Sequence, residues 1–239
     1  MSEPEDFTVQ VTDADKVTAR LYSAARANRI GITLVLGHGA GANQFSGFMQ
    51  QYASGLAERG VDVMTFNFIY MELKKKVPDV KAKLELCYRK VVEAALIHKK
   101  LKNNRLVIGG KSMGGRIASQ LAAALAELDD PLASKISGLV FLGYPLHPPG
   151  NPSKLRTEHL KNIPMKMLFV QGTRDSLGTP DEIKPLIKQL RLPAEIYSIE
   201  SGDHSFKVTK SAGVTQQQVH EAAMDHIVLW CNSKMSDKL

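Results

Sequence analysis

Hydrophobic and polar positions along this chain follow two alternating patterns. Short apolar runs that end at glycine, proline or charged residues recur throughout, and such runs are typical of buried strands. Between them lie longer stretches in which apolar residues recur at the spacing of one helix face, as Leu84, Val91 and Ala95 do. Because strands and helices alternate, the sequence predicts an α/β fold with a mostly parallel central sheet and helices on both faces.

The expected elements can be placed along the chain. A β-hairpin is expected at residues 7–22, where two strand-like segments flank the polar turn 12–16. The strands expected after it cover residues 32–36, 61–68, 105–108, 136–142, 165–170 and 194–199. The expected helices cover residues 45–59, 80–100, 113–128, 181–190 and 214–230. No repeat or linker divides the chain, so a single domain is expected over residues 1–239, with its core at about 32–230.

The connection from Tyr144 to Pro164 bears on how open a site in this fold would be. It has 21 residues and is rich in proline. This length is too short for a helical cap, so no separate cap domain is expected. Any crevice at this edge of the sheet should be open or roofed by one loop.

Composition and charge narrow the possible partners. The chain is 44% hydrophobic and 23% charged, as ordinary globular proteins are. Its net charge is +7, partly from the basic runs 74–76 and 98–102. A basic excess can indicate nucleic-acid binding, but these runs lack interleaved aromatic residues and lie at the ends of expected helices, where solvated lysines are common. We therefore expect no nucleic-acid partner.

Cysteine usage and the N-terminal segment predict a cytoplasmic protein. Cys87 and Cys231 have no metal-ligand spacing, and each lies in an apolar helical pattern, as reduced thiols do. Residues 1–6 are acidic and polar, unlike the basic and then apolar start of a secretory signal. No apolar run approaches the ~20 residues that span a bilayer, so no membrane association is expected.

The segment after the strand 105–108 carries the clearest chemical motif. Gly110, Ser112 and Gly114 match the pattern G-x-S-x-G. A serine on a tight strand-to-helix turn has a strained backbone, and glycines two positions away remove side chains that would collide with it. Ser112 would also begin a helix, where developing negative charge is favoured. We expect Ser112 to be a nucleophile; the alternative is a glycine-rich turn that binds phosphate.

A second glycine-rich segment, residues 37–43, directly follows the strand 32–36. Small residues at this place let a backbone N–H group approach an oxyanion. We expect this donor to be Ala40, with Gly41 as the next candidate and a substrate contact. The N–H group of Met113, the residue after the nucleophile, would be the second donor.

Two other interpretations of the segment 37–43 are weaker. His38 could act as a base, but we expect it to be a structural residue that is hydrogen-bonded within the loop. A dinucleotide site would need the frame G-x-G-x-x-G, and Ala42 occupies the place of its third glycine.

An acid and a base follow later strands. Asp175 comes after the strand 165–170, where a carboxylate could accept a hydrogen bond from an imidazole. Asp181 and Glu182 are the alternative acids, but they are expected to begin the next helix. His204 follows the last strand in a glycine-containing loop. Ser112, Asp175 and His204 also occur in the chain order of α/β-hydrolase triads.

Tyr144 and His147 follow the strand 136–142 and are expected at the rim of the crevice. Their functional interpretation is substrate contact. The alternative is a rigid structural turn held by the neighbouring prolines.

Over residues 32–230 the chain resembles the α/β-hydrolase superfamily, whose dienelactone-hydrolase-like members are nearest in size. A closer resemblance is to testis-expressed protein 30, the hydrolase-like domain of the third NSL-complex subunit and their bacterial relatives. It is carried by Gly-Gly-Lys-Ser-Met-Gly-Gly-Arg at 109–116, Gly-Tyr-Pro-Leu-His-Pro-Pro at 143–149 and Lys-Leu-Arg at 154–156. The resemblance implies the fold and a serine-hydrolase site.

Lys111 departs from the histidine or phenylalanine that precedes the nucleophile in many hydrolases. A cation beside Ser112 would favour an anionic acyl substrate, unless its side chain turns away from the crevice.

These observations predict a serine hydrolase that cleaves a small-molecule carboxylic ester or thioester through an acyl-enzyme on Ser112. His204 would be the base and Asp175 its orienting acid, and no metal or organic cofactor is implied. Some relatives resemble non-catalytic parts of protein assemblies, so the alternative is a catalytically silent interaction module. Peptidase or perhydrolase chemistry at the same site is a further alternative. The sequence does not indicate an oligomeric state.

Overall fold

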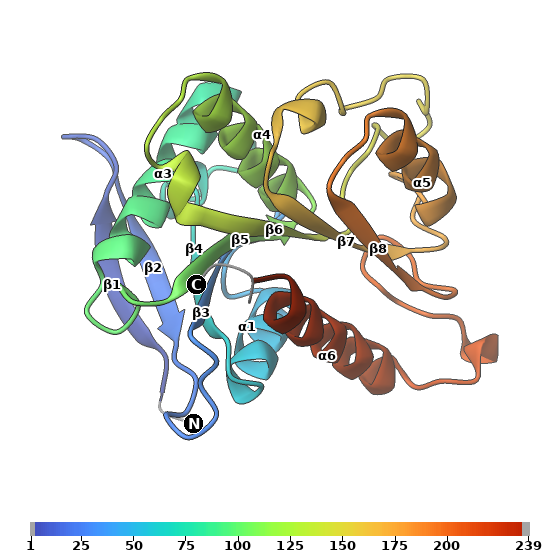
Figure 1. Cartoon of the computed structure of the whole chain (residues 1–239), viewed down its shortest axis with the longest axis horizontal. Helices are drawn as coiled ribbons and strands as arrows, with labels where there is room; N and C mark the ends of the chain where they lie inside the picture. Colours follow the sequence, from blue (N-terminus) through green and yellow to red (C-terminus); the bar gives the residue numbers. More distant parts are fainter. Residues whose placement is uncertain (1–2, 236–239) are drawn as a thin grey trace.

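The computed structural model of the protein describes residues 3–235. Its strands form one eight-stranded sheet in the order β1-β2-β4-β3-β5-β6-β7-β8 (Figure 1). The strands are β1 (Glu5–Gln10), β2 (Lys16–Tyr22), β3 (Ile32–Gly37), β4 (Asp62–Phe66), β5 (Arg105–Lys111), β6 (Ile136–Leu142), β7 (Lys166–Gly172) and β8 (Ala194–Ile199). The strand β2 pairs antiparallel with β1 and β4, and all other neighbours are parallel. The expected hairpin and the mostly parallel sheet are both confirmed.

Helices cover both faces of this sheet, as the sequence predicted (Figure 1). One apolar core lies beneath α3, α4 and α5, and a second lies beneath α1 and α6. The helices are α1 (Gly47–Glu58), α2 (Ile69–Glu72), α3 (Lys81–Ile97), α4 (Met113–Glu127), α5 (Pro180–Gln189) and α6 (Gln216–Met235). Short 3-10 helices are η1 (Ala133–Lys135), η2 (Leu160–Asn162) and η3 (Lys210–Ala212).

The central strands are apolar on both faces because both faces are covered. Every residue of β3 and of β4 is buried. A parallel sheet between two helix layers needs such continuous apolar strands, whereas a half-exposed strand would alternate. The edge strand β1, in contrast, is mostly exposed and carries Glu5 and Asp6.

The hydroxyl of Tyr88 links α3 to the centre of the sheet through hydrogen bonds. Its hydroxyl accepts a hydrogen bond from the N–H group of Gly109 at 2.9 Å. The same oxygen lies 2.8 Å from the carbonyl of Val35 and 2.5 Å from that of Gly109. The ring is fully buried, so these bonds satisfy polar atoms that water cannot reach. They join β3 to β5, the two strands that lead into the site described below.

Two element boundaries differ from the sequence expectation for identifiable reasons. The strand expected at 61–68 ends at Phe66. The N–H group of Phe68 donates to Nε2 of His38 instead of to a neighbouring strand, and the short helix α2 follows. The strand expected to end at residue 108 continues to Lys111, because Gly109 and Gly110 still pair with β3 and β6.

The connection between β6 and β7 contains only η2, so the described residues form no separate cap domain. Within residues 3–235, no helix is both long and apolar enough to cross a membrane. The ends of the expected domain, including Met1 and Ser2 of the polar N-terminal segment, lie outside the described residues.

Candidate active site

Ser112 lies at the sharp turn between β5 and α4, at the carboxyl edge of the sheet. It is the N-cap of α4 and has φ 51 and ψ −114, a conformation that L-residues adopt only under strain. Its N–H group donates to the carbonyl of Leu142 at 3.0 Å, which holds the turn against the end of β6. The turn therefore has the strained strand-to-helix geometry that the motif predicted.

Close backbone packing requires the flanking glycines, and the nearest atom to an added side chain at either position belongs to Gly37. A Cβ atom on Gly114 would lie 2.2 Å from the carbonyl oxygen of Gly37, and one on Gly110 would lie 2.4 Å from the same atom. The first turn of α4 thus packs directly on the end of β3. This contact sets the height of Ser112 above the sheet.

His204 bridges Ser112 and Asp175. Its Nε2 atom lies 2.9 Å from Oγ of Ser112, and its Nδ1 atom lies 2.8 Å from Oδ2 of Asp175. Asp175 is buried and follows β7, whereas His204 follows β8 and is partly exposed. The three side chains come from distant parts of the chain and meet because the carboxyl ends of parallel strands share one edge of the sheet.

Gln171, at the end of β7, fixes the position of the buried carboxylate. Its Nε2 atom donates to Oδ2 of Asp175 at 2.8 Å, and Oδ1 of Asp175 accepts from the N–H group of Leu177 at 2.8 Å. The carboxylate therefore remains hydrogen-bonded although its side chain is buried. With Asp175 ionised, Nδ1 of His204 carries the proton and Nε2 is free to accept one from Ser112.

A cleft of about 310 Å³ opens beside Ser112. Ala40, Ser112 and Met113 all line it, so the two expected oxyanion donors share a cleft with the expected nucleophile. Gly41 is exposed at φ 72 and is not among the residues that line this cleft. The structure brings Ala40 and Met113 to Ser112, and it does not bring Gly41 into the same space.

His38 supports the loop that carries Ala40. Its Nδ1 atom lies 2.8 Å from the carbonyl of Gly39, and its Nε2 atom accepts from Phe68 at 3.1 Å. Burial lowers the pKa of His38 to about 4, so the ring is neutral at physiological pH. The ring is fully buried and hydrogen-bonded, which agrees with the structural role expected for it.

Tyr144 and His147 do not lie at the rim of the crevice, so that expectation was wrong. Tyr144 is fully buried, and its hydroxyl donates to the carbonyl of Arg156 at 2.9 Å. His147 is also buried, with Nδ1 2.9 Å from the carbonyl of Pro148 and Nε2 3.2 Å from Glu182. Both side chains brace the connection between β6 and β7, because its backbone carbonyls and the first turn of α5 offer polar partners beneath the surface.

Asp181 and Glu182 begin α5, as expected. Glu182 accepts hydrogen bonds from the N–H group and the hydroxyl of Thr179, both at 2.8 Å. This is a capping box, which satisfies a donor at the start of the helix. Neither acid is bonded to His204.

The side chain of Lys111 turns away from the cleft, although the residue is next to Ser112 in the chain. It is buried and is not among the residues that line the cleft. Its Nζ atom and Cε1 of His204 both lie beside Gly143. A Cβ atom placed on that glycine would be 3.0 Å from Nζ and 3.4 Å from Cε1. Lys111 therefore lies beneath the site and is not placed to contact a substrate in the cleft.

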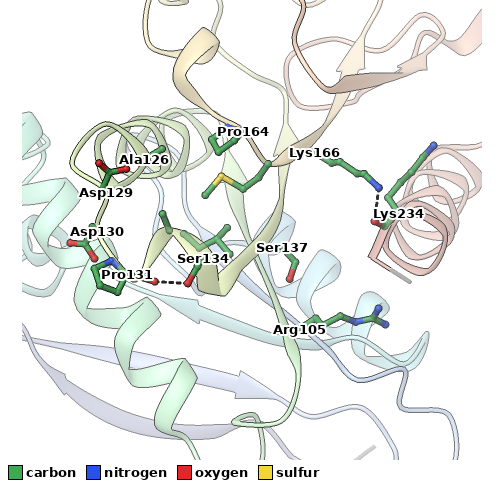
Figure 2. Close-up of a pocket in the computed structure, with 13 residues that line it drawn as sticks. Arg105, Ala126, Asp129, Asp130, Pro131, Ser134, Ser137, Pro164, Lys166 and Lys234 are labelled. Atoms are coloured by element: carbon green, nitrogen blue, oxygen red, sulfur yellow. Dashed lines mark hydrogen bonds between the residues drawn. The ribbon is translucent and has the colours of Figure 1, made fainter. Parts of the chain in front are cut away.

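A larger pocket of about 660 Å³ lies at the opposite edge of the sheet (Figure 2). Its walls include Arg105, Ile136 and Lys166, which begin β5, β6 and β7. Lys166 donates to the carbonyl of Lys234 at 3.0 Å across one side of it. Ligand sites of parallel sheets lie at the carboxyl ends of the strands, so the smaller cleft is the functional candidate.

Sequence reasoning missed Gln171, Arg116 and Arg156. Gln171 ends a strand and carries no motif, so nothing marked it as the partner of Asp175. Arg116 and Arg156 both line the cleft beside Ser112. They lie within two of the three segments that carried the family resemblance, 109–116 and 154–156, and that was the only available signal.

A mostly parallel sheet with a serine on a strained turn after a central strand, and an acid and a histidine after later strands, defines the α/β hydrolase class. A family model described as an alpha/beta hydrolase domain matches residues 31–232, so the chain belongs to this family.

Solved structures agree with this fold. A serine hydrolase without a lid from Xanthomonas campestris has a TM-score of 0.71 at 17% identity and covers 96% of each chain. Dienelactone hydrolase from Anabaena variabilis has a TM-score of 0.71 at 18% identity, over 98% of this chain and 100% of that one. Est1E from Butyrivibrio proteoclasticus has a TM-score of 0.68 at 14% identity, over 95% and 99%.

Proposed function

We propose that this protein is a serine hydrolase that cleaves a carboxylic ester or thioester through an acyl-enzyme on Ser112. The observation that carries the proposal is the position of His204, which lies within hydrogen-bond distance of both Ser112 and Asp175. The strained conformation of Ser112, with φ 51, supports the same role. Backbone strain of this kind is kept where it serves a site.

The proposed reaction begins when Oγ of Ser112 attacks the substrate carbonyl carbon while Nε2 of His204 takes the hydroxyl proton. The N–H groups of Ala40 and Met113 would hold the oxyanion, and each such donor contributes about 3 kcal/mol to catalysis where one has been removed in other enzymes. His204 then returns the proton to the leaving alcohol or thiol. A water molecule repeats the attack on the acyl-enzyme and releases the acid.

The test is labelling with a fluorophosphonate probe. The wild type should be labelled, and Ser112→Ala and His204→Ala should not be. Ser119→Ala is a matched control, because Oγ of Ser119 also lies 2.8 Å from a histidine nitrogen, Nε2 of His159. Burial lowers the pKa of His159 to about 4, which makes it a poor base, so this control should be labelled like the wild type. A folded wild type that is not labelled would contradict the proposal and favour the interaction module.

We also propose the narrower kinship with the testis-expressed protein 30 and NSL-complex group, on the three motifs quoted above. The proposed cytoplasmic location is supported by Cys87 and Cys231, which are both free thiols.

A further inference from the structure

Two arginines face the cleft beside Ser112. Arg116 comes from the first turns of α4, and Arg156 comes from the connection between β6 and β7. Both side chains are half-buried, so their charges are partly removed from water. Neither belongs to the Ser112, His204 and Asp175 arrangement.

These two guanidinium groups differ from those of Arg20, Arg59 and Arg89, because neither has a carboxylate oxygen within ion-pair distance among the described residues. Arg20, Arg59 and Arg89 each have a carboxylate oxygen within 2.8 Å. Within the described residues 3–235, neither Arg116 nor Arg156 forms an ion pair, and Nε of Arg116 is buried without a hydrogen-bond partner. A half-buried guanidinium that lacks an acceptor is costly to the folded protein, and a bound anion would supply that acceptor.

The pKa of Arg156 indicates that the charges of Arg116 and Arg156 interact. Burial lowers it, and the positive charge of Arg116 lowers it further. The same charge contributes, after burial and Lys81, to the low pKa of His159. Two like charges this close repel each other, so an anion placed between them would relieve the repulsion.

The other charged groups of the cleft leave it positive. Asp79 and Lys81 also line it, which gives three cations against one carboxylate. Glu85 does not line the cleft and lies 3.5 Å from Lys81; burial raises its pKa, against the opposing effect of the Lys81 and Arg116 charges. The cleft therefore retains an excess of positive charge next to the proposed nucleophile.

The spacing of Ser112 and Arg116 by one helical turn suits a small substrate with two functional groups. The backbone N–H group of Arg116 donates to the backbone carbonyl of Ser112 at 3.1 Å. The two residues therefore lie one helical turn apart on the same face of α4. Four residues of helix rise by about 6 Å, and the side chain of Arg116 adds to that reach. Leu84, Ile117 and Leu177 line the cleft around this path and would contact a short methylene chain.

We propose that Arg116 and Arg156 bind a carboxylate of the substrate, and that the substrates are half esters or half thioesters of short aliphatic dicarboxylic acids. This inference rests on the proposed function, since it names the acyl group that Ser112 would accept. Both guanidinium groups can offer paired N–H donors to one carboxylate, which gives both charge and orientation.

The test compares two aryl esters of the same shape. The 4-nitrophenyl half ester of adipate carries the carboxylate, and 4-nitrophenyl 6-methylheptanoate carries methyl groups in place of its oxygens. The ratio of kcat/KM for the charged over the neutral ester is the measure, because a loss of folded protein lowers both rates alike. The wild-type ratio should be about tenfold or more, and Arg116→Gln or Arg156→Gln should bring it close to one. Arg26→Gln is the control, since Arg26 is exposed and is not among the residues that line the cleft.

A binding measurement separates this inference from the proposed function. Adipate should bind to the Ser112→Ala variant in calorimetry, and adding Arg116→Gln should weaken that binding by about tenfold or more. Fluorophosphonate labelling without any charge preference or adipate binding would overturn the inference and leave the serine hydrolase intact. Adipate binding without labelling would support the anion site and contradict the hydrolase. A wild-type ratio near one, or an equal effect of Arg26→Gln, would also overturn the inference.

Discussion

The Nζ atom of Lys111 lies 5.7 Å from the centre of the Phe48 ring. The ring centre of Phe206 lies 5.9 Å from the same atom, and the two rings contact each other. Within residues 3–235 the ammonium group has no hydrogen-bond partner, and the residue is 9% exposed. Burial lowers the pKa of Lys111 to about 8, against the opposing effect of the Asp175 and Asp203 charges.

Replacing Lys111 by methionine should stabilise the fold at neutral pH. The apolar side chain fills the same space without a desolvated charge, and we expect the free energy of unfolding at pH 7 to rise by about 2 kcal/mol. Urea denaturation measures this change. Lys111→Arg is the control, because it keeps the charge and should not be stabilised.

The stabilisation by Lys111→Met should shrink as the pH rises. The folded-state pKa of Lys111, about 8, lies below the ordinary value of 10.5. Between these pH values the unfolded chain binds more protons than the folded one. The contribution of Lys111 to the free energy of unfolding of the wild type therefore rises with pH. The methionine variant lacks that gain, and the two proteins should converge between about pH 8 and 10.5. A stability difference that stays constant over this range would contradict the assignment.

Changing Asp175 to asparagine should remove most of the activity without unfolding the protein. The N–H group of Leu177 donates to Oδ1, so the amide oxygen should take that place, and the NH₂ group should take the place of Oδ2, where it faces Nδ1 of His204 and loses the bond from Gln171. His204 would then carry its proton on Nε2 and could not accept one from Ser112. We expect kcat for 4-nitrophenyl acetate to fall by about 10⁴-fold. Asp181→Asn, at the exposed start of α5, should keep wild-type activity.

Removing the hydroxyl of Tyr88 should weaken the contact between β3 and β5. In Tyr88→Phe the N–H group of Gly109 loses its acceptor inside the core, and the free energy of unfolding should fall by about 2 kcal/mol. Tyr197→Phe is the comparison, since Tyr197 is partly exposed and its ring stacks on His226. We expect it to stay within about 0.5 kcal/mol of the wild type, measured by urea denaturation. Equal effects of the two changes would contradict this role of Tyr88.

Two helical glycines should respond oppositely to alanine. A Cβ atom on Gly114 would lie 2.2 Å from the carbonyl oxygen of Gly37, which is backbone and cannot move aside. Gly114→Ala should therefore cost about 3 kcal/mol or more and displace Ser112. Gly47, at the start of α1, has open space around the same position. Gly47→Ala should raise the thermal midpoint slightly, because alanine favours helix by up to about 1 kcal/mol. A tolerated Gly114→Ala would show that α4 does not depend on this close approach.

The positions of the elements were largely predictable, because buried strands and amphipathic helices each leave a periodic pattern. Residues 136–142 and 194–199 form the strands expected there. The order of the strands was not predictable from this pattern, since β4 lies between β2 and β3 although it follows β3 in the chain. The short helix α2 was missed, because four residues are too few to show a helical period.

The candidate site was predictable where function follows chain position, and not where it follows packing. Ser112, Asp175 and His204 each lie within five residues of the carboxyl end of a strand, so the sheet itself brings them to one edge. Tyr144 has the same relation to β6, yet its side chain turns inward to the carbonyl of Arg156. The direction of the Tyr144 side chain depends on the path of the connection between β6 and β7. The path of a loop produces no periodic pattern of apolar residues in the sequence. Arg156 was missed for the same reason.

The separation of the site residues along the chain has a consequence for folding kinetics. Ser112 and His204 are 92 residues apart, and Asp175 and His204 are 29 apart. No local hairpin or helix pair contains the site, and contacts between distant residues form late because long loops must close first. Partly folded chains with native-like helices should therefore be inert. During refolding, the reactivity of Ser112 should return after the far-ultraviolet dichroism, once β8 has joined the edge of the sheet.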